Sequence, residues 1–255
     1  MAGLMSDVCA IWEPSTKDLW KSSMLTRQLP LESALPNQSR ISSKQLYEIA
    51  EIFTRNNAHG ILGLHLLHRH FDIPVGTVLL GSTWSKPYCR WTTATEIEGT
   101  DWSETGGAVF ILTAEGWHPY EYLRNGKPDL SCVKPGFLPQ ITEYLVSNQL
   151  SQILGLQILD RSLHTDQHLI ELSLSEMSVM FFASDLKGCV PTRQTGWRFE
   201  LHDGQPRVCQ YNESHGARPD GSHDIYNQGQ LDLQYGDFEM LRYRLMRDGF
   251  LKIDS

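Results

Sequence analysis

The sequence predicts an α+β fold, in which antiparallel sheets carry a duplicated helix–strand–strand unit and a C-terminal helix ends the domain. Three observations favour it: a segment that recurs along the chain, strands whose apolar residues alternate, and a helical pattern near the C-terminus. We expect a single α+β domain over residues 42–255. Residues 1–41 are rich in Ser, Pro, Thr and Leu without a clear period, which predicts an irregular N-terminal arm.

The recurring segment covers residues 46–80 and 138–172, which align without a gap. Its most similar stretch is the tetrapeptide ILGL, at 61–64 in the first copy and at 153–156 in the second. An ungapped register favours an internal duplication over a chance similarity between amphipathic elements. We therefore expect both copies to form the same helix and strands, each burying one helix face on a strand pair.

The first copy begins with a helix. Ser42 and Gln45 have the spacing of a capping box, and Asn56 and Asn57 can end the helix because Asn tolerates the left-handed conformation. Strands are predicted at 61–71 and 77–81, because both runs are apolar and a turn signal separates them. A helix over 61–71 is the alternative, since periodicity does not distinguish a strand from a helix in a short apolar run.

Other elements follow from alternation and spacing. The phase of the apolar residues switches between 170–174 and 177–181, which predicts a hairpin, and 197–201 alternates before a turn at Asp203-Gly204. Apolar residues at helical spacing within 237–249 predict the last helix. The residues expected to be mostly buried are Ile61, Leu64, Leu66, Leu154, Leu156, Ile158, Leu172 and Leu174.

Composition excludes several function classes. The net charge is −8 and no block of Lys and Arg occurs, so neither a nucleic acid nor an anionic membrane is an expected partner. The sequence shows neither a signal peptide nor a membrane-spanning run, and its five cysteines are scattered without a CxxC pair, so we expect a cytoplasmic protein with reduced thiols. No phosphate-binding glycine loop, GxSxG or HExxH motif occurs.

A histidine cluster is the first candidate for chemistry. His65, His68 and His70 lie in one predicted strand, where His68 and His70 share a face. Two imidazoles on one face can bind a metal, or act as a base and the group that orients it. The second copy has no histidine at the aligned positions, as expected of a site added to a repeated scaffold. The alternative is that they are ordinary strand-end residues.

A polar stretch at 212–227 is the second candidate. It contains His215, and its Pro219, Gly221, His223 and Asn227 resemble the second cupin motif with one residue missing. Combined with the histidine cluster, this spacing suggests a cupin-like metal site of three histidines. The two motifs lie far apart in the chain and the repeat does not look like a jelly roll, so a turn-rich surface loop is the alternative.

Several segments carry a resemblance to a known group. They are GLHLLHRHF at 63–71, GWRFE at 196–200, PRVCQ at 206–210, NESH at 212–215, and DGSH at 220–223 followed by Asn227. Together they resemble a broad group of uncharacterised filamentous-fungal proteins, over roughly residues 45–230. The chain departs from that group before the NE pair, where the group has a glycine and this chain has Gln210-Tyr211. The resemblance implies a fungal source and implies no activity.

These observations favour a fungal intracellular enzyme that acts on a small metabolite as a lyase, isomerase or cyclase. We expect His68, His70 and His215 to be catalytic, with no cofactor or with a single divalent metal held by His68, His70 and His223. A non-catalytic binding or protein-interaction module is the alternative, and a cupin-like metal-dependent enzyme is a second one. Convergence of the two histidine groups would favour chemistry, because proton transfer and metal sharing need contact distances.

Overall fold

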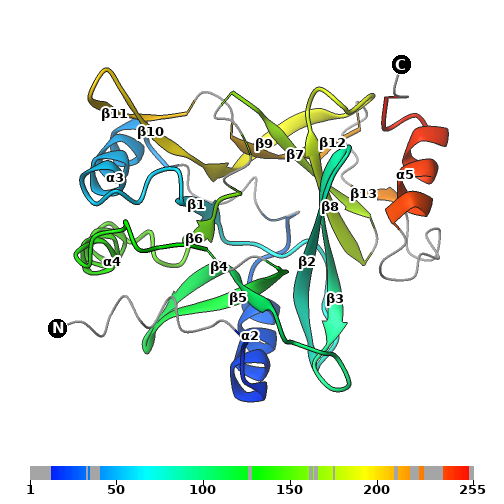
Figure 1. Ribbon diagram of the computed structural model, residues 1–255, viewed down its shortest axis with the longest axis horizontal. Helices are drawn as coiled ribbons and strands as arrows, with labels where there is room; N and C mark the ends of the chain where they lie inside the picture. The colour runs from blue at the N-terminus through cyan, green and yellow to red at the C-terminus, as the bar shows by residue number, and fades with distance from the viewer. Residues whose placement is uncertain are drawn as a thin grey trace.

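A computed structural model shows a closed mixed β-barrel of ten strands with helices packed against its outer surface (Figure 1). The structure describes residues 13–32, 34, 41–125, 128–160, 163, 166–174, 176–209, 212–218, 224–226 and 238–252. None of the described helices combines the length and the apolar character needed to cross a membrane.

The strands follow one another around the barrel in an order unlike their order in the chain. That order is β12 (Glu213–Ala217), β9 (Val190–Trp197), β1 (Leu62–Leu66), β6 (Leu154–Ile158), β4 (Thr105–Thr113), β5 (Gly116–Arg124), β2 (Thr77–Ser85), β3 (Tyr88–Glu96), β8 (Met177–Phe182) and β7 (Leu169–Leu174). A parallel pairing of β7 with β12 closes the ring, and β2 with β5 is a second parallel pair.

The remaining elements lie around this barrel. They are β13 (Asp224–Tyr226) beside β7, the hairpin of β10 (Phe199–His202) and β11 (Gln205–Val208), and the helices α2 (Thr16–Gln28), α3 (Ser43–Arg55), α4 (Phe137–Ser147) and α5 (Phe238–Arg247). The two parallel pairs distinguish the barrel from an antiparallel jelly roll, so the structure does not support the cupin-like alternative.

The predicted α+β fold with antiparallel sheets and a duplicated helix–strand–strand unit is wrong. Segments 46–80 and 138–172 do contribute α3-β1-β2 and α4-β6-β7, but β1 is not hydrogen-bonded to β2, nor β6 to β7. Instead β1 pairs with β6, placing Leu64 opposite Leu156. Hydrophobic periodicity identifies the elements but carries no information on which distant strands become neighbours, and that pairing turns the sheets into one barrel.

The predictions of single helices and hairpins were more accurate than the prediction of the overall architecture. The capping box of α3 is confirmed, since the backbone N–H of Gln45 donates to Ser42 Oγ and that of Ser42 donates to Gln45 Oε1. Asn57 has the left-handed conformation expected after the helix. The hairpins β7–β8 and β10–β11 and the helix α5 are also confirmed.

Residues 16–28, part of the segment expected to be irregular, form the helix α2. Its buried positions are one apolar residue, Leu19, and three small polar ones, Ser22, Ser23 and Thr26. Ser22 Oγ donates to the carbonyl of Pro119, so this face attaches to β5 through hydrogen bonds. An apolar stripe is therefore missing, and the periodicity of the sequence gave no sign of the helix.

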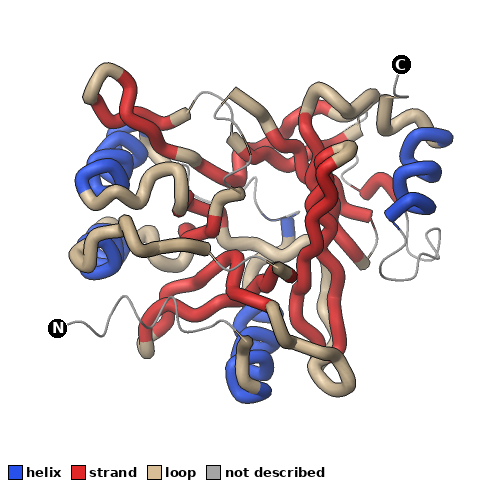
Figure 2. Tube along the Cα trace, in the orientation of Figure 1, coloured by secondary structure: helices blue, strands red, loops and turns tan. Residues whose placement is uncertain are grey.

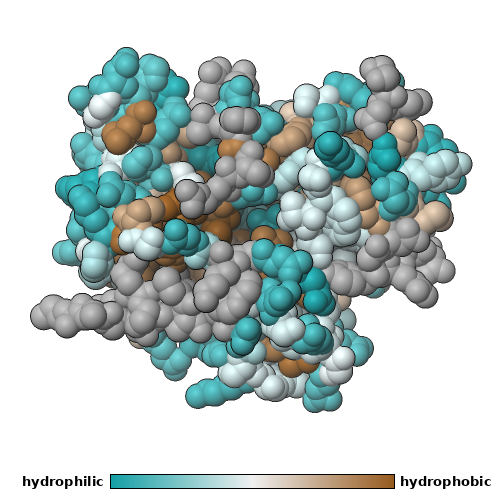
Figure 3. Space-filling view, viewed as in Figure 1, coloured by the Kyte–Doolittle hydropathy of each residue, from teal (hydrophilic) through white to brown (hydrophobic). Residues whose placement is uncertain are grey.

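The largest part of the hydrophobic core lies outside the barrel, between strands and helices. Leu64 and Leu66 of β1 and Leu156 of β6 point towards α3 and α4, and α5 covers β7 and β8 in the same way. Of the residues predicted to be mostly buried, Ile158 alone is half-buried. On the face shown in Figure 3, brown side chains gather near β1 and β6, left of centre.

The alternation that directs apolar side chains outwards directs polar ones into the barrel. His65 of β1, Gln157 of β6, Glu121 of β5, Glu171 of β7 and Glu213 of β12 line one internal cavity. The strand predicted over 61–71 ends at Leu66, and the chain then runs across the ring of strands towards β2 (Figure 2). This crossing brings His70 beside Glu171 of β7 and His68 beside His215 of β12.

Candidate metal centre inside the barrel

Four side chains from three separate segments converge inside the barrel. His68 and His70 come from the crossing segment after β1, Glu171 from β7 and His215 from β12. Each offers one ligand atom, and these atoms all lie within 4.8 Å of one another. All four residues are buried. The parallel pairing of β7 with β12 sets Glu171 beside His215, so closure of the barrel creates half of the group.

The spacing of these atoms suits a small divalent ion. His68 Nε2 lies 3.1 Å from His215 Nε2, and His70 Nε2 lies 3.0 Å from Glu171 Oε1. Two ligands bound tetrahedrally at about 2.0–2.1 Å from Zn²⁺ are about 3.3 Å apart, close to both separations. Three imidazoles and one carboxylate are also a donor set that Zn²⁺ and neighbouring transition metals accept.

His68 is held in the orientation that a metal ligand needs. Its Nδ1–H donates to the carbonyl oxygen of Leu66 at 2.6 Å, which leaves a lone pair on Nε2 facing His215. Metal-binding histidines usually donate their second ring N–H to a carbonyl or carboxylate in this way, which fixes the tautomer. This hydrogen bond joins neighbouring residues, so the local backbone of the crossing segment suffices to form it.

Glu32 adds a second carboxylate at the edge of the group. Its Oε2 lies 3.3 Å from His70 Nδ1 and 3.3 Å from His215 Nε2, and it accepts a hydrogen bond of 2.5 Å from Ser173 Oγ. It follows α2 on a segment that Arg69 ties to the barrel, because Arg69 Nε donates to the carbonyl of Leu29. Glu32 can therefore orient His70 from its second nitrogen while the first binds a metal.

Without a metal, the same residues form a charge network. Burial alone would lower the pKa of His70, but Glu171 and Glu32 outweigh it and raise that pKa well above its ordinary value. Burial would raise the pKa of Glu171, but the charge of His70 and its hydrogen bond hold it well below the usual range. Burial and the charge of His70 both lower the pKa of His68, so His68 is a neutral ligand at neutral pH.

A polar chamber adjoins this group and shares Glu171 with it. Its volume is about 10 Å³, room for about one water molecule, and its walls include Arg90 and Glu213. Both ring nitrogens of His65, Gln157 Nε2, Glu171 Oε2 and Glu213 Oε2 are buried and find no hydrogen-bond partner among the described residues. Unsatisfied buried groups each cost about 1–3 kcal/mol, so a water molecule or another small polar group in the chamber would stabilise these atoms.

Two carboxyl groups of the chamber have raised pKa values. Burial raises the pKa of Glu213 and that of Glu121 above the ordinary value, although the nearby Arg90 guanidinium opposes the shift in both. Arg90 Nη2 lies 3.6 Å from Glu121 Oε2. The chamber therefore places two carboxyl groups with raised pKa values beside Glu171, whose pKa is lowered, and environments that separate pKa values in this way suit acid–base chemistry.

The structure brings together the three residues expected to be catalytic, His68, His70 and His215. His215 lies on a barrel strand and not in the loop predicted over 212–227, because β12 pairs with both β7 and β9. His65 was expected on the face opposite to His68, but β1 ends before His68, and the two rings stack with centroids 5.2 Å apart. His223, the remaining predicted ligand, lies outside the described residues, as do Pro219, Gly221 and Asn227.

The sequence did not identify Glu171 or Glu32 as candidates. Glu171 occupies a polar position of an alternating strand, a pattern that is equally typical of a side chain facing solvent. Glu32 lies in the segment expected to be irregular. Only the pairing of β7 with β12 and the path of residues 29–32 bring these carboxylates to the histidines, and neither leaves a local signature.

Comparison with known protein families, curated proteins and solved structures found no relative of this chain. No protein family matches the chain, and neither a curated protein nor a solved structure is significantly similar to it. The functional argument therefore depends on the geometry of the site.

His65 predicts a specific loss of stability in acid. Burial lowers its pKa from the ordinary 6.5 to about 4. The unfolded chain binds this proton below pH 6.5 and the folded chain does not until about pH 4. The contribution of neutral His65 to the free energy of unfolding is therefore fully present above pH 6.5. It should fall by up to about 3 kcal/mol as the pH decreases from 6.5 to about 4. We expect His65→Gln, which copies Gln157 of the aligned segment, to flatten that pH dependence in urea unfolding. Equal pH dependence in both proteins would contradict this assignment.

Proposed function

We propose that this protein is a metal-dependent enzyme in which His68, His70, His215 and Glu171 hold one divalent transition-metal ion such as Zn²⁺. The observation that carries the proposal is the convergence of four buried ligand atoms within 4.8 Å, supplied by segments far apart in the chain. Burying several titratable groups is expensive unless they are paired or bind a metal. The adjoining chamber supports a role beyond structure, since several of its buried polar atoms have no hydrogen-bond partner among the described residues.

The chemistry supported best is metal-assisted elimination or isomerisation of a small oxygen-containing molecule. A bound metal would polarise a carbonyl or hydroxyl oxygen. Glu213 and Glu121, with raised pKa values, are the carboxylic acids that can donate a proton nearby. Arg90 can neutralise negative charge that develops on the substrate, and no step requires an electron acceptor. The class is therefore a lyase or isomerase acting on a small metabolite.

Substrate entry requires part of the wall to move, because the chamber holds only about 10 Å³. Residues 29–32 lie against the group of four proposed metal ligands, and they are bound to the crossing segment by two backbone hydrogen bonds with Arg69. Displacing them would take Glu32 away from His70 and His215 and open the group from that side. We propose this displacement as the entry route.

A structural metal site is the second candidate, and complete burial of the ligands favours it. Closed four-ligand sites are typical of structural zinc, whereas catalytic sites keep a position for water or substrate. In that case the protein would be a non-catalytic binding or interaction module, and its metal would stabilise the barrel.

Cobalt substitution tests the proposal and separates the two candidates. Untagged full-length protein, stripped with a chelator and titrated with Co²⁺, should develop the visible absorption of a four-coordinate ion and saturate at one equivalent. His68→Ala should lose this absorption. Added azide should then change the spectrum if the metal has an exchangeable position. A spectrum that azide leaves unchanged would contradict the enzyme and support the structural site, and absence of Co²⁺ binding would contradict both.

We also propose a cytoplasmic location. Cys89, Cys132, Cys189 and Cys209 are all free thiols, as expected in a reducing compartment. A fluorescent fusion expressed in a filamentous fungus should fill the cytoplasm, and its accumulation in the secretory pathway would contradict this location.

A further inference from the structure

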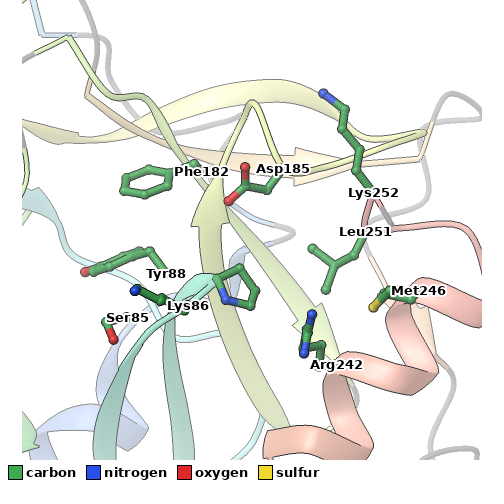
Figure 4. Close-up of a pocket in the computed structure, with 10 residues that line it drawn as sticks. Ser85, Lys86, Tyr88, Phe182, Asp185, Arg242, Met246, Leu251 and Lys252 are labelled. Atoms are coloured by element: carbon green, nitrogen blue, oxygen red, sulfur yellow. The ribbon is translucent and has the colours of Figure 1, made fainter. Parts of the chain in front are cut away.

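A second cavity lies on the outer side of the barrel wall, between the tip of the β2–β3 hairpin, the end of β8 and α5 (Figure 4). Its volume is about 600 Å³, within the range of about 300–1,000 Å³ that is typical of small-molecule sites. It shares no lining residue with the polar chamber, and none of the four proposed metal ligands lines it. A ligand held here would therefore be separate from the metal chemistry proposed above.

The charge of this cavity is opposite to that of the whole chain. Lys86, Arg242 and Lys252 line it against one acidic residue, Asp185, although the chain carries a net charge of −8. The Lys252 ammonium donates to the carbonyl of Ser184, and Arg242 Nη1 lies 3.4 Å from Glu239. The Lys86 ammonium makes no ion pair with any residue that the structure describes. The cavity thus presents positive charge that the protein leaves partly unneutralised.

The other walls are apolar and flat. The rings of Tyr88 and Phe182 stack with centroids 4.9 Å apart and planes 26° apart. Figure 4 shows these rings on one side of the cavity and Leu251, Met246 and Arg242 on the other. A planar group between these walls would contact an aromatic ring on one side and aliphatic or thioether groups on the other, an arrangement that favours aromatic ligands.

We propose that this cavity binds a small organic anion in which a carboxylate, phosphate or sulfonate is attached to a flat ring. Arg242 and Lys86 bind the anionic group through charge-assisted hydrogen bonds. The ring lies against Phe182 and the apolar side chains of α5. Neither feature is sufficient alone, since a bare anion would leave the apolar walls uncovered, and a neutral ring would give the Lys86 ammonium no counter-charge in the cavity.

Matched probes and matched variants test this site. The probes are 1-naphthoate, its neutral analogue 1-naphthalenemethanol and inorganic phosphate, each titrated into the full chain by calorimetry and by ligand-observed NMR. We expect 1-naphthoate to saturate one site. Both other probes should bind with an affinity at least about tenfold lower. Arg242→Gln should weaken 1-naphthoate binding about tenfold. Arg244→Gln, on the same helix but outside the cavity lining, should leave it unchanged.

Two further variants keep the test decisive. Lys86→Met, at an exposed hairpin position, should weaken 1-naphthoate binding even if Arg242→Gln proves unstable. Phe182→Ala should weaken 1-naphthoate and leave phosphate binding as it is. Equal affinity for 1-naphthoate and its neutral analogue would overturn the anionic part of the proposal. Equal affinity for phosphate would overturn the aromatic part, and no saturable binding of 1-naphthoate would overturn the whole.

Discussion

His215→Ala should remove tight metal binding and leave a folded protein. The substitution deletes one of the four proposed ligands and also the neighbour 3.1 Å from His68 Nε2. Changing groups that merely orient ligands already costs about 10–100-fold in metal affinity, so deleting a ligand should cost more than about 100-fold. Competition with a chromophoric chelator measures this affinity. The stabilisation that saturating metal gives the wild-type protein should disappear as well, because it depends on the dissociation constant.

His202→Ala is the matched control. His202 is exposed on the β10–β11 hairpin and is not one of the four grouped residues, so its replacement should leave both affinity and metal-dependent stabilisation unchanged. If His215→Ala retained one equivalent of metal at wild-type affinity, His215 would not be a ligand. The group would then be a charge network centred on His70, with no need for a metal.

Leu156→Ala should destabilise the protein strongly. Leu156 is fully buried at the centre of β6, where it pairs with Leu64 of β1 and with Phe110 of β4. Its side chain lies in the cluster that α3 and α4 form on the outer surface of the barrel. Truncating a buried leucine leaves a cavity and costs about 2–5 kcal/mol. Chemical unfolding measures this change in the free energy of unfolding.

Val146→Ala on α4 provides the comparison. Val146 is 56% exposed, so this truncation should change stability by less than about 0.5 kcal/mol. A cost below about 1 kcal/mol for Leu156→Ala would place Leu156 outside the packed core and would contradict the described contact between β6 and the two helices.

The sequence predicted local structure better than global structure, for a physical reason. The hairpin β7–β8 and the helix α3 depend on neighbouring residues, whose alternation, phase and capping are visible in the chain. The parallel pairing of β7 with β12 joins residues more than 40 positions apart, and no local pattern records it. Closure of the barrel therefore could not be predicted, although several of its strands could.

The same reason explains why only some residues of the candidate metal site could be predicted from the sequence. The histidines were recognisable because three lie close together at 65, 68 and 70. Their carboxylate partners were not, since Glu171 alternates with apolar residues just as a solvent-facing residue would. In a barrel with a polar interior, alternation identifies the two faces of a strand but does not say which face is enclosed.

Anomalous X-ray diffraction from crystals of the untagged protein, loaded with Zn²⁺ and recorded on both sides of the zinc edge, tests the central claim most directly. The proposed site predicts one strong anomalous peak inside the barrel, about 2.0–2.2 Å from nitrogen atoms of His68, His70 and His215 and from an oxygen of Glu171. A peak at other residues, or no peak within the barrel at saturating Zn²⁺, would contradict it.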